Sequence, residues 1–292
     1  MARHALILPL LAAALGAAKP APAEGAAPGP LLVGISARLS PRESFAFYEP
    51  LLGYLGGKLG RRVEMIQFST YEEMDSALER RDLDFAFLCS RSYVRDHAKF
   101  GVELLAAPQS HGRAFYYAVL IVPATSTARS LADLRGRRFA FTDPGSATGR
   151  LAPAYQVRRE FGVSPEAFFS DVVYAGSHDG AIAEVNAGTV DGASVDSLVY
   201  EYLAARHPER VQHVRILAKS PPYGVPPVVA NRRADPGVRR RVAEVLLGMH
   251  ADPDGRRLLD AIRVERFIVP ADADYDAVRE METRLAERGP PR

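Results

Sequence analysis

Short apolar runs alternate with segments of helical spacing, and this alternation constrains the fold more than any other feature of the chain. Leu31–Ser36 is an apolar run of strand length, and Glu43–Leu59 then carries apolar residues at helical intervals. Val63–Phe68 alternates like a strand, and a helix expected over Tyr71–Arg80 leads to an apolar strand over Asp84–Leu88. The pattern predicts an α/β fold with a mostly parallel sheet flanked by helices.

The same alternation resumes after Tyr117–Val122, an apolar run long enough to cross between two lobes. Further strands are expected over Arg138–Phe141, Asp171–Tyr174 and Val190–Val195, with helices over Leu151–Phe161 and His178–Asn186. Pro221–Pro227 (PPYGVPP) is incompatible with a helix or a central strand and predicts a rigid connection.

The length of the chain and its crossing segments together predict two lobes. At 292 residues and 47% hydrophobic content, the chain is long enough to bury a sizeable core. Val228–Ala230 is expected to cross back to the first lobe. We therefore assign residues 31–118 and 228–292 to one lobe and residues 119–227 to the other.

The N-terminus has the pattern of an export signal. Met1–His4 is a short basic start, Ala5–Ala18 is apolar, and Ala21–Ala23 resembles a small-residue cleavage site. We expect residues 1–23 to be a signal peptide and residues 24–30 a disordered tail. The alternative is an N-terminal core helix, but a segment rich in Pro, Ala and Gly would pack poorly after it.

Charge and cysteine content exclude several classes of function. Cleavage would remove Arg3 and Lys19 and no acid, so the formal charge would fall from +2 to 0. A chain without net basicity has no electrostatic case for nucleic acid. The single cysteine, Cys89, excludes a disulfide framework and a cysteine-based metal site. We expect an exported, periplasmic protein.

One stretch, Phe141–Pro153 (FTDPGSATGRLAP), has the composition of an anion site. It follows a predicted strand and begins a predicted helix, whose first N–H groups lack internal partners and carry partial positive charge. Such N–H groups hold a small tetrahedral anion. Hydroxyl side chains and exposed backbone would come from Ser146, Ala147, Thr148 and Gly149. An ordinary turn followed by a helix cap is the alternative.

An internal echo connects two further residues. Tyr71 begins a predicted helix and Asp84 a strand thirteen positions later; His178 and Asp191 repeat that spacing. The segments YEEMDSALERRDLDFAFLC and HDGAIAEVNAGTVDGASVD share acids, apolar spacing and a turn. One interpretation is two similar lobes, each bringing a polar side chain at a helix start to a shared cleft. A chance likeness of two common helix–strand units is the other.

Three tyrosines are candidates for the same cleft. The phenol of Tyr71 can donate to an oxyanion from the position that matches His178. Tyr116 precedes the crossing strand, where lining the cleft and packing in a core are equal possibilities. Tyr93 is favoured as a structural residue.

A catalytic alternative can be built from Ser146, His178 and either Asp179 or Asp196. However, the serine lies in P-G-S-A-T-G rather than in a G-x-S-x-G elbow, and the order Ser–His–Asp fits no common triad. The seven histidines show no H-E-x-x-H spacing. We expect neither catalysis nor a metal or other cofactor.

Taken together, the motifs DPGSATGRLAP, GSHDGAIAEVNAGTVDGA and KSPPYGVPP resemble those of periplasmic phosphate/phosphite/phosphonate-binding proteins of ABC transporters. The likeness spans nearly the whole mature chain and also includes STYEEM and YYAVLIV. It implies a two-lobed type II periplasmic-binding fold that closes on a small oxyanion and delivers it to a membrane permease, as a monomer. A sensing partner of a membrane receptor would use the same fold.

The resemblance also implies the site residues. It places Ser146, Ala147 and Thr148 on the phosphonate oxygens, joined by His178, Tyr71 and Tyr116. Ala147 replaces a hydroxyl residue usual in the family. Leu198 and Pro226 stand where members that bind amino-phosphonates carry acids, which disfavours a cationic tail. Asp196 either supplies that acid or is structural. The resemblance therefore favours phosphite, phosphate or a small alkyl phosphonate.

Overall fold

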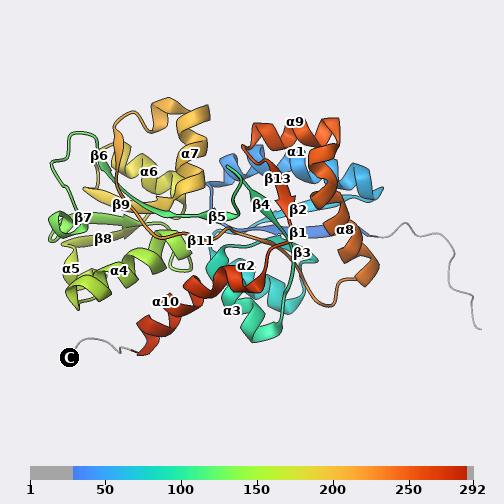
Figure 1. The fold of residues 1–292 in the computed structure, drawn as a ribbon, viewed down its shortest axis with the longest axis horizontal. Helices are drawn as coiled ribbons and strands as arrows, with labels where there is room; N and C mark the ends of the chain where they lie inside the picture. The colour runs from blue at the N-terminus through green and yellow to red at the C-terminus, as the bar shows by residue number, and fades with distance from the viewer. Residues whose placement is uncertain (1–28, 288–292) are drawn as a thin grey trace, which may run out of the picture.

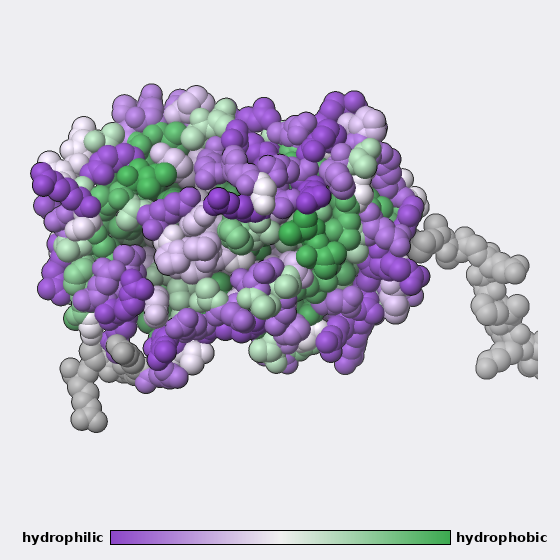
Figure 2. Space-filling view, viewed as in Figure 1, coloured by the Kyte–Doolittle hydropathy of each residue, from purple (hydrophilic) through white to green (hydrophobic). Residues whose placement is uncertain are grey.

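A computed structural model describes residues 29–287 of the chain, and Figure 1 shows two halves, each built on its own sheet. The expected signal peptide, residues 1–23, and most of the expected tail, residues 24–30, lie outside the described residues. Within them, no helix combines the length and apolarity needed to cross a membrane. Figure 2 shows polar side chains over much of the visible face, with apolar areas on both halves.

The first sheet has mixed strand directions. Its strands in spatial order are β13 (Arg266–Ile268), β4 (Glu103–Gln109), β12 (Val228–Ala230), β3 (Phe85–Phe87), β1 (Leu31–Ile35) and β2 (Val63–Gln67). β1 pairs in parallel with β2 and β3, whereas β12 runs antiparallel to both β3 and β4, and β13 antiparallel to β4. The prediction of a mostly parallel sheet thus holds for β1 to β4; the strands from the C-terminal part of the chain reverse direction.

The second sheet repeats this plan. Its strands in spatial order are β10 (Val214–Lys219), β6 (Ala118–Pro123), β9 (Gly192–Asp196), β7 (Arg138–Phe141) and β8 (Asp171–Tyr174). β7 pairs in parallel with β8 and β9, whereas β6 is antiparallel to both β9 and β10. A two-stranded sheet of β5 (Phe115–Tyr116) and β11 (Tyr223–Gly224) lies between the halves in Figure 1.

Helices cover both faces of each sheet. On the first sheet, one core contains residues of α1 (Pro41–Leu59), α8 (Pro236–Gly248) and α9 (Pro253–Ala261). The other contains residues of α2 (Tyr71–Arg80), α3 (Ser90–Phe100) and α10 (Asp276–Glu287). On the second sheet, α6 (His178–Asn186) and α7 (Ser197–Arg206) pack on one face, and α4 (Ala152–Phe161) and α5 (Pro165–Phe168) on the other.

The two halves share a five-element unit, which gives the internal echo a structural reason. The order β3-β1-β2 in one sheet matches β9-β7-β8 in the other, and the helices correspond as well, α1 to α4 and α2 to α6. Asp84 accepts the backbone N–H of Leu32 at 2.9 Å, and Asp191 accepts that of Arg138 at 2.9 Å. Each acid therefore joins the start of the third strand of its unit to the start of the first.

Candidate ligand site

Six parallel strand ends bring hydrogen-bonding side chains together between the halves. Parallel strands end at one edge of a sheet, and that edge is where open α/β sheets place ligands. Each of β1, β2, β3, β7 and β8 is followed within a few residues by such a side chain, and β9 ends in one; in order these are Arg38, Tyr71, Cys89, Ser146, His178 and Asp196. All but Arg38 are almost fully buried, and the Arg38 side chain is 13% exposed.

An ion pair crosses from one half to the other at this place. Arg38 Nε donates to Asp196 Oδ2 at 2.8 Å, and the Asp196 side chain is 1% exposed. Burial alone would lower the pKa of Arg38, but the adjacent Asp196 carboxylate raises it, so the guanidinium stays charged. Asp196 also accepts the N–H groups of Leu198 and Val199, which caps α7.

His178 is held as a neutral hydrogen-bond donor. Its Nδ1 accepts the backbone N–H of Asp196 at 3.0 Å, and burial lowers its pKa to about 4. A neutral imidazole with an accepting Nδ1 carries its proton on Nε2. That atom lies 3.4 Å from the Ser146 hydroxyl. The imidazole therefore presents an N–H group at the start of the helical segment that follows β7.

The Ser146–Gly149 segment begins with a π-helical turn, Ala147–Leu151, that leads into α4. Ser146 Oγ accepts the Gly149 N–H at 2.9 Å. A Cβ on Gly149 would lie 1.9 Å from Thr142 Oγ1, so close packing against Thr142 requires glycine. The Ala147 N–H points to Cys89 Sγ at 3.4 Å. Burial raises the pKa of Cys89, so the thiol keeps its proton.

Tyr71 and Tyr116 lie close to this segment. Tyr71 is the first residue of α2 and packs with Ala37, Cys89 and Ala147 in a small buried cluster. The Tyr116 hydroxyl lies 2.6 Å from Ser90 Oγ, next to Cys89 at the start of α3.

Tyr93 occupies a different place. Its hydroxyl donates to Asp272, and its ring centroid lies 4.5 Å from that of Tyr275. It belongs to the core beneath α10, which also contains Tyr116, and its hydroxyl is directed to Asp272 and not to the side chains at the strand ends.

Sequence reasoning missed Arg38, Tyr48, Cys89 and Ser90. Arg38 contacts Asp196 as described, and Tyr48 on α1 lies close to Arg38. The available signal was the internal echo, because the unit that places Ser146 after β7 must place another segment after β1. Nothing in the local sequence around Arg38 distinguishes it from a surface arginine.

The geometry does not form a hydrolase triad. Nδ1 of His178 accepts a backbone N–H instead of donating to a carboxylate, so Nε2 already holds a proton and cannot take one from Ser146. Asp179 is engaged elsewhere, since it accepts from Ser40 and Arg210. In the described part of the chain, His, Cys, Asp and Glu do not gather in groups suited to a metal ion.

Known proteins share this chain's sequence pattern and fold. A family model described as the periplasmic substrate-binding protein of phosphonate ABC transporters matches residues 33–275. A probable phosphite-binding protein of an ABC transporter from Prochlorococcus marinus is 24% identical over 242 residues, which is 79% of this chain and 81% of that protein. The phosphonates-binding periplasmic protein of Escherichia coli is 24% identical over 242 residues, covering 80% of this chain and 70% of that one.

Solved structures agree on the fold. A binding-protein component of a phosphonate ABC transporter from Pseudomonas aeruginosa superposes with a TM-score of 0.83 at 20% identity, covering 89% of this chain and 87% of that one. The Prochlorococcus marinus protein PhnD1, in complex with methylphosphonate, has a TM-score of 0.78 at 23% identity, covering 88% and 98%. The fold is therefore that of type II periplasmic binding proteins, as expected. The chain belongs to the family of periplasmic substrate-binding proteins of phosphonate ABC transporters, which are transport components and not enzymes.

Proposed function

We propose that this chain captures a phosphorus oxyanion at the place where the six strand ends meet, and delivers it to the permease of an ABC transporter. The observation that carries the proposal is the combination of a charged guanidinium, a neutral imidazole N–H and several hydroxyl groups in one buried cluster. Charge-assisted hydrogen bonds to an anion contribute about 1.5–3 kcal/mol each, so a few support tight binding. Of the similar proteins from Prochlorococcus marinus, one is described as a probable phosphite-binding protein, and the solved structure contains methylphosphonate.

Each residue has a distinct part in the proposed site. Donors to the oxyanion come from Arg38, Tyr71, Tyr116, Ser146, Thr148 and His178, with the backbone of Ala147. Gly149 permits the turn that positions these groups, because any larger residue would overlap Thr142. Its own N–H donates to Ser146 Oγ, so we do not count it among the donors to the ligand. Asp196 orients Arg38 and His178 through its carboxylate and its backbone N–H.

In this proposal, the ligand is captured when two lobes close on it. One lobe consists of residues 31–118 and 228–292, and the other of residues 119–227. Donors from both sides can reach one small anion only when the lobes are together, so the ligand favours the closed state by differential affinity. Further contacts join the halves: Asp179 accepts from the Ser40 N–H at 2.7 Å, and Arg210 donates to Glu43 at 2.9 Å. We assign the protein to the periplasm as a monomer with an exported N-terminus.

Titration calorimetry of the purified mature chain tests the proposal. We expect methylphosphonate or phosphite to bind, and Arg38→Gln to weaken that binding at least tenfold because the charged donor is lost. Arg42→Gln, on the exposed start of α1, is the matched control and should bind like the wild type. If no phosphorus oxyanion binds, or if sulfate alone binds, the proposal is wrong.

A further inference from the structure

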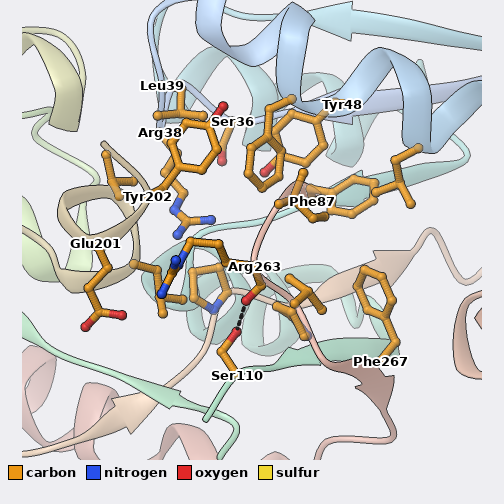
Figure 3. A pocket seen from close by; sticks show the side chains of 18 of the residues that line it. Ser36, Arg38, Leu39, Tyr48, Phe87, Ser110, Glu201, Tyr202, Arg263 and Phe267 are labelled. Carbon is orange, nitrogen blue, oxygen red and sulfur yellow. Dashed lines mark hydrogen bonds between the residues drawn. The ribbon is translucent and has the colours of Figure 1, made fainter. Parts of the chain in front are cut away.

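A cavity opens beside Arg38, between the two halves. Figure 3 shows the Arg38 guanidinium projecting into the space among Tyr48, Phe87 and Tyr202. Tyr48 and Phe87 come from the first half and Tyr202 from α7 of the second. An anion bound to Arg38 would therefore have this cavity on one side, where any substituent on its phosphorus would lie.

The walls of the cavity are largely apolar, and the charged or titratable side chains among the described residues that line it, apart from Glu201 and the tyrosines, are the basic ones of Arg38, His111 and Arg263. Besides the three rings, the side chains that contribute apolar surface include Leu39, Phe47, Leu51, Leu198, Pro226 and Phe267. Leu198 lies two residues after Asp196 and donates its backbone N–H to that carboxylate, which fixes its position relative to the Arg38 ion pair. The apolar surface thus begins next to the proposed anion site.

The cavity offers no buried carboxylate to a cationic substituent. Among the described residues that line it, only Glu201 is acidic, and its side chain is 40% exposed. Glu201 lies 3.6 Å from His111, itself 67% exposed, and Figure 3 shows its carboxylate pointing away from Arg38. Asp196 is already paired with Arg38. An ammonium group placed among these walls would lose its hydration without gaining a counter-ion, which is costly.

The size of the cavity limits the substituent. Its volume is about 60 Å³, and a water molecule needs roughly 10–15 Å³ by the same measure. A chain of a few carbon atoms would fill it. A bare inorganic oxyanion would leave it empty of everything except water.

From these observations we infer that the ligand is an organic R–PO₃ compound whose R group is short, apolar and without a positive charge. The inference rests on the proposed function and adds the class of substituent to it. Burial of each methylene in such a cavity strengthens binding about fourfold. The apolar wall therefore selects against both inorganic phosphite and amino-substituted phosphonates.

Two ligands of equal shape test the inference by calorimetry. Propylphosphonate and 2-aminoethylphosphonate differ only by a terminal methyl in place of an ammonium group. We expect propylphosphonate to bind at least tenfold more tightly than 2-aminoethylphosphonate, and roughly fifteenfold more tightly than methylphosphonate, because it has two more methylene groups. Propyl phosphate is included to distinguish a C–P from a C–O–P linkage; tight binding of either propyl compound supports an apolar substituent.

A charge placed on the cavity wall should reverse the preference. Leu198→Asp supplies the missing counter-ion, so we expect 2-aminoethylphosphonate to bind it more tightly than propylphosphonate. Leu198→Asn has the same shape without the charge and should weaken propylphosphonate binding without favouring the amine. Methylphosphonate affinity, measured for both variants, reports whether the anion site is intact.

The possible outcomes separate this inference from the proposed function. Phosphite, methylphosphonate or 2-aminoethylphosphonate binding as tightly as propylphosphonate would overturn the apolar substituent and leave oxyanion capture standing. Failure of every phosphorus compound to bind the wild-type chain would overturn the proposed function itself.

Discussion

At the scale of single residues, burial decides the form in which His178 meets a ligand. Its pKa is lowered to about 4 by burial, below the ordinary value of 6.5. Between these values the unfolded chain binds a proton that the folded chain excludes, so the free energy of unfolding rises with pH from about 4 to 6.5. We expect His178→Gln to flatten this rise by about 3 kcal/mol. Thermal denaturation between pH 4 and pH 7 measures it.

The matched control for this prediction is His213→Gln, because His213 is exposed on the second half. It should keep the wild-type pH dependence of stability. An unchanged slope in His178→Gln would show that the imidazole titrates normally in the folded chain. The glutamine should also keep part of the ligand affinity, since its side-chain N–H replaces a neutral donor.

For Asp96, the free energy of unfolding changes with pH in the opposite direction. Burial, and next the neighbouring Asp75 carboxyl, raise the pKa of Asp96 to about 8, and its Oδ2 has no hydrogen-bond partner in the described structure. The folded chain therefore retains a proton that the unfolded chain releases near pH 3.8, so stability falls as pH rises from about 4 to 8. At pH 8 we expect Asp96→Asn to be more stable than the wild type by a few kcal/mol and therefore to melt at a higher temperature. Near pH 4 the two proteins should have the same melting temperature.

The exposed Asp82→Asn is the control for Asp96→Asn and should change neither melting temperature appreciably. Equal stabilisation by Asp96→Asn at both pH values would contradict the retained proton. It would point instead to a hydrogen bond made by the new amide.

At the scale of elements, the sequence predicted the repeated unit and the crossing strands β6 and β12, whereas it missed helix α3. Strands β1 and β2 and helices α2 and α6 were predicted because their apolar residues keep one period from end to end. Ser90–Phe100 (SRSYVRDHAKF) was not predicted as a helix, since buried Ser92 and Asp96 interrupt its apolar pattern.

The residues of the candidate site divide in the same way. Ser146 lies in a motif, and His178 in a repeated spacing, that can each be recognised in the sequence itself. Arg38 and Cys89 enter the site only through the relative placement of the two halves, which no local pattern specifies.

The Gly149 turn gives a prediction at this scale. We expect Gly149→Ala to destabilise the protein by about 1–3 kcal/mol, because its Cβ would overlap Thr142 at 1.9 Å from Oγ1. Chemical denaturation measures the loss. Gly53→Ala in α1 is the control, since a Cβ there has no atom within 4 Å, and it should be neutral or slightly stabilising. Equal effects of the two substitutions would mean that the turn relaxes away from Thr142.

At the scale of the whole molecule, the Arg38–Asp196 ion pair connects stability to ligand capture. The pair neutralises the buried guanidinium in the absence of a ligand, and it joins the two halves at 2.8 Å. An incoming oxyanion must then share Arg38 with a carboxylate that repels it. The same contact that stabilises the free protein therefore limits the affinity for the anion.

Asp196→Asn separates these two effects. The substitution keeps an oxygen that can cap α7 and keeps the backbone N–H that orients His178. It leaves Arg38 buried without a counter-ion, so we expect the free protein to lose about 3 kcal/mol of stability. Phosphonate affinity should rise about tenfold, because the ligand becomes the only partner of the charge. Denaturation and calorimetry measure the two quantities on one sample. A fall in both would show that Asp196 holds Arg38 in its binding orientation, and that this outweighs the repulsion between the two anions.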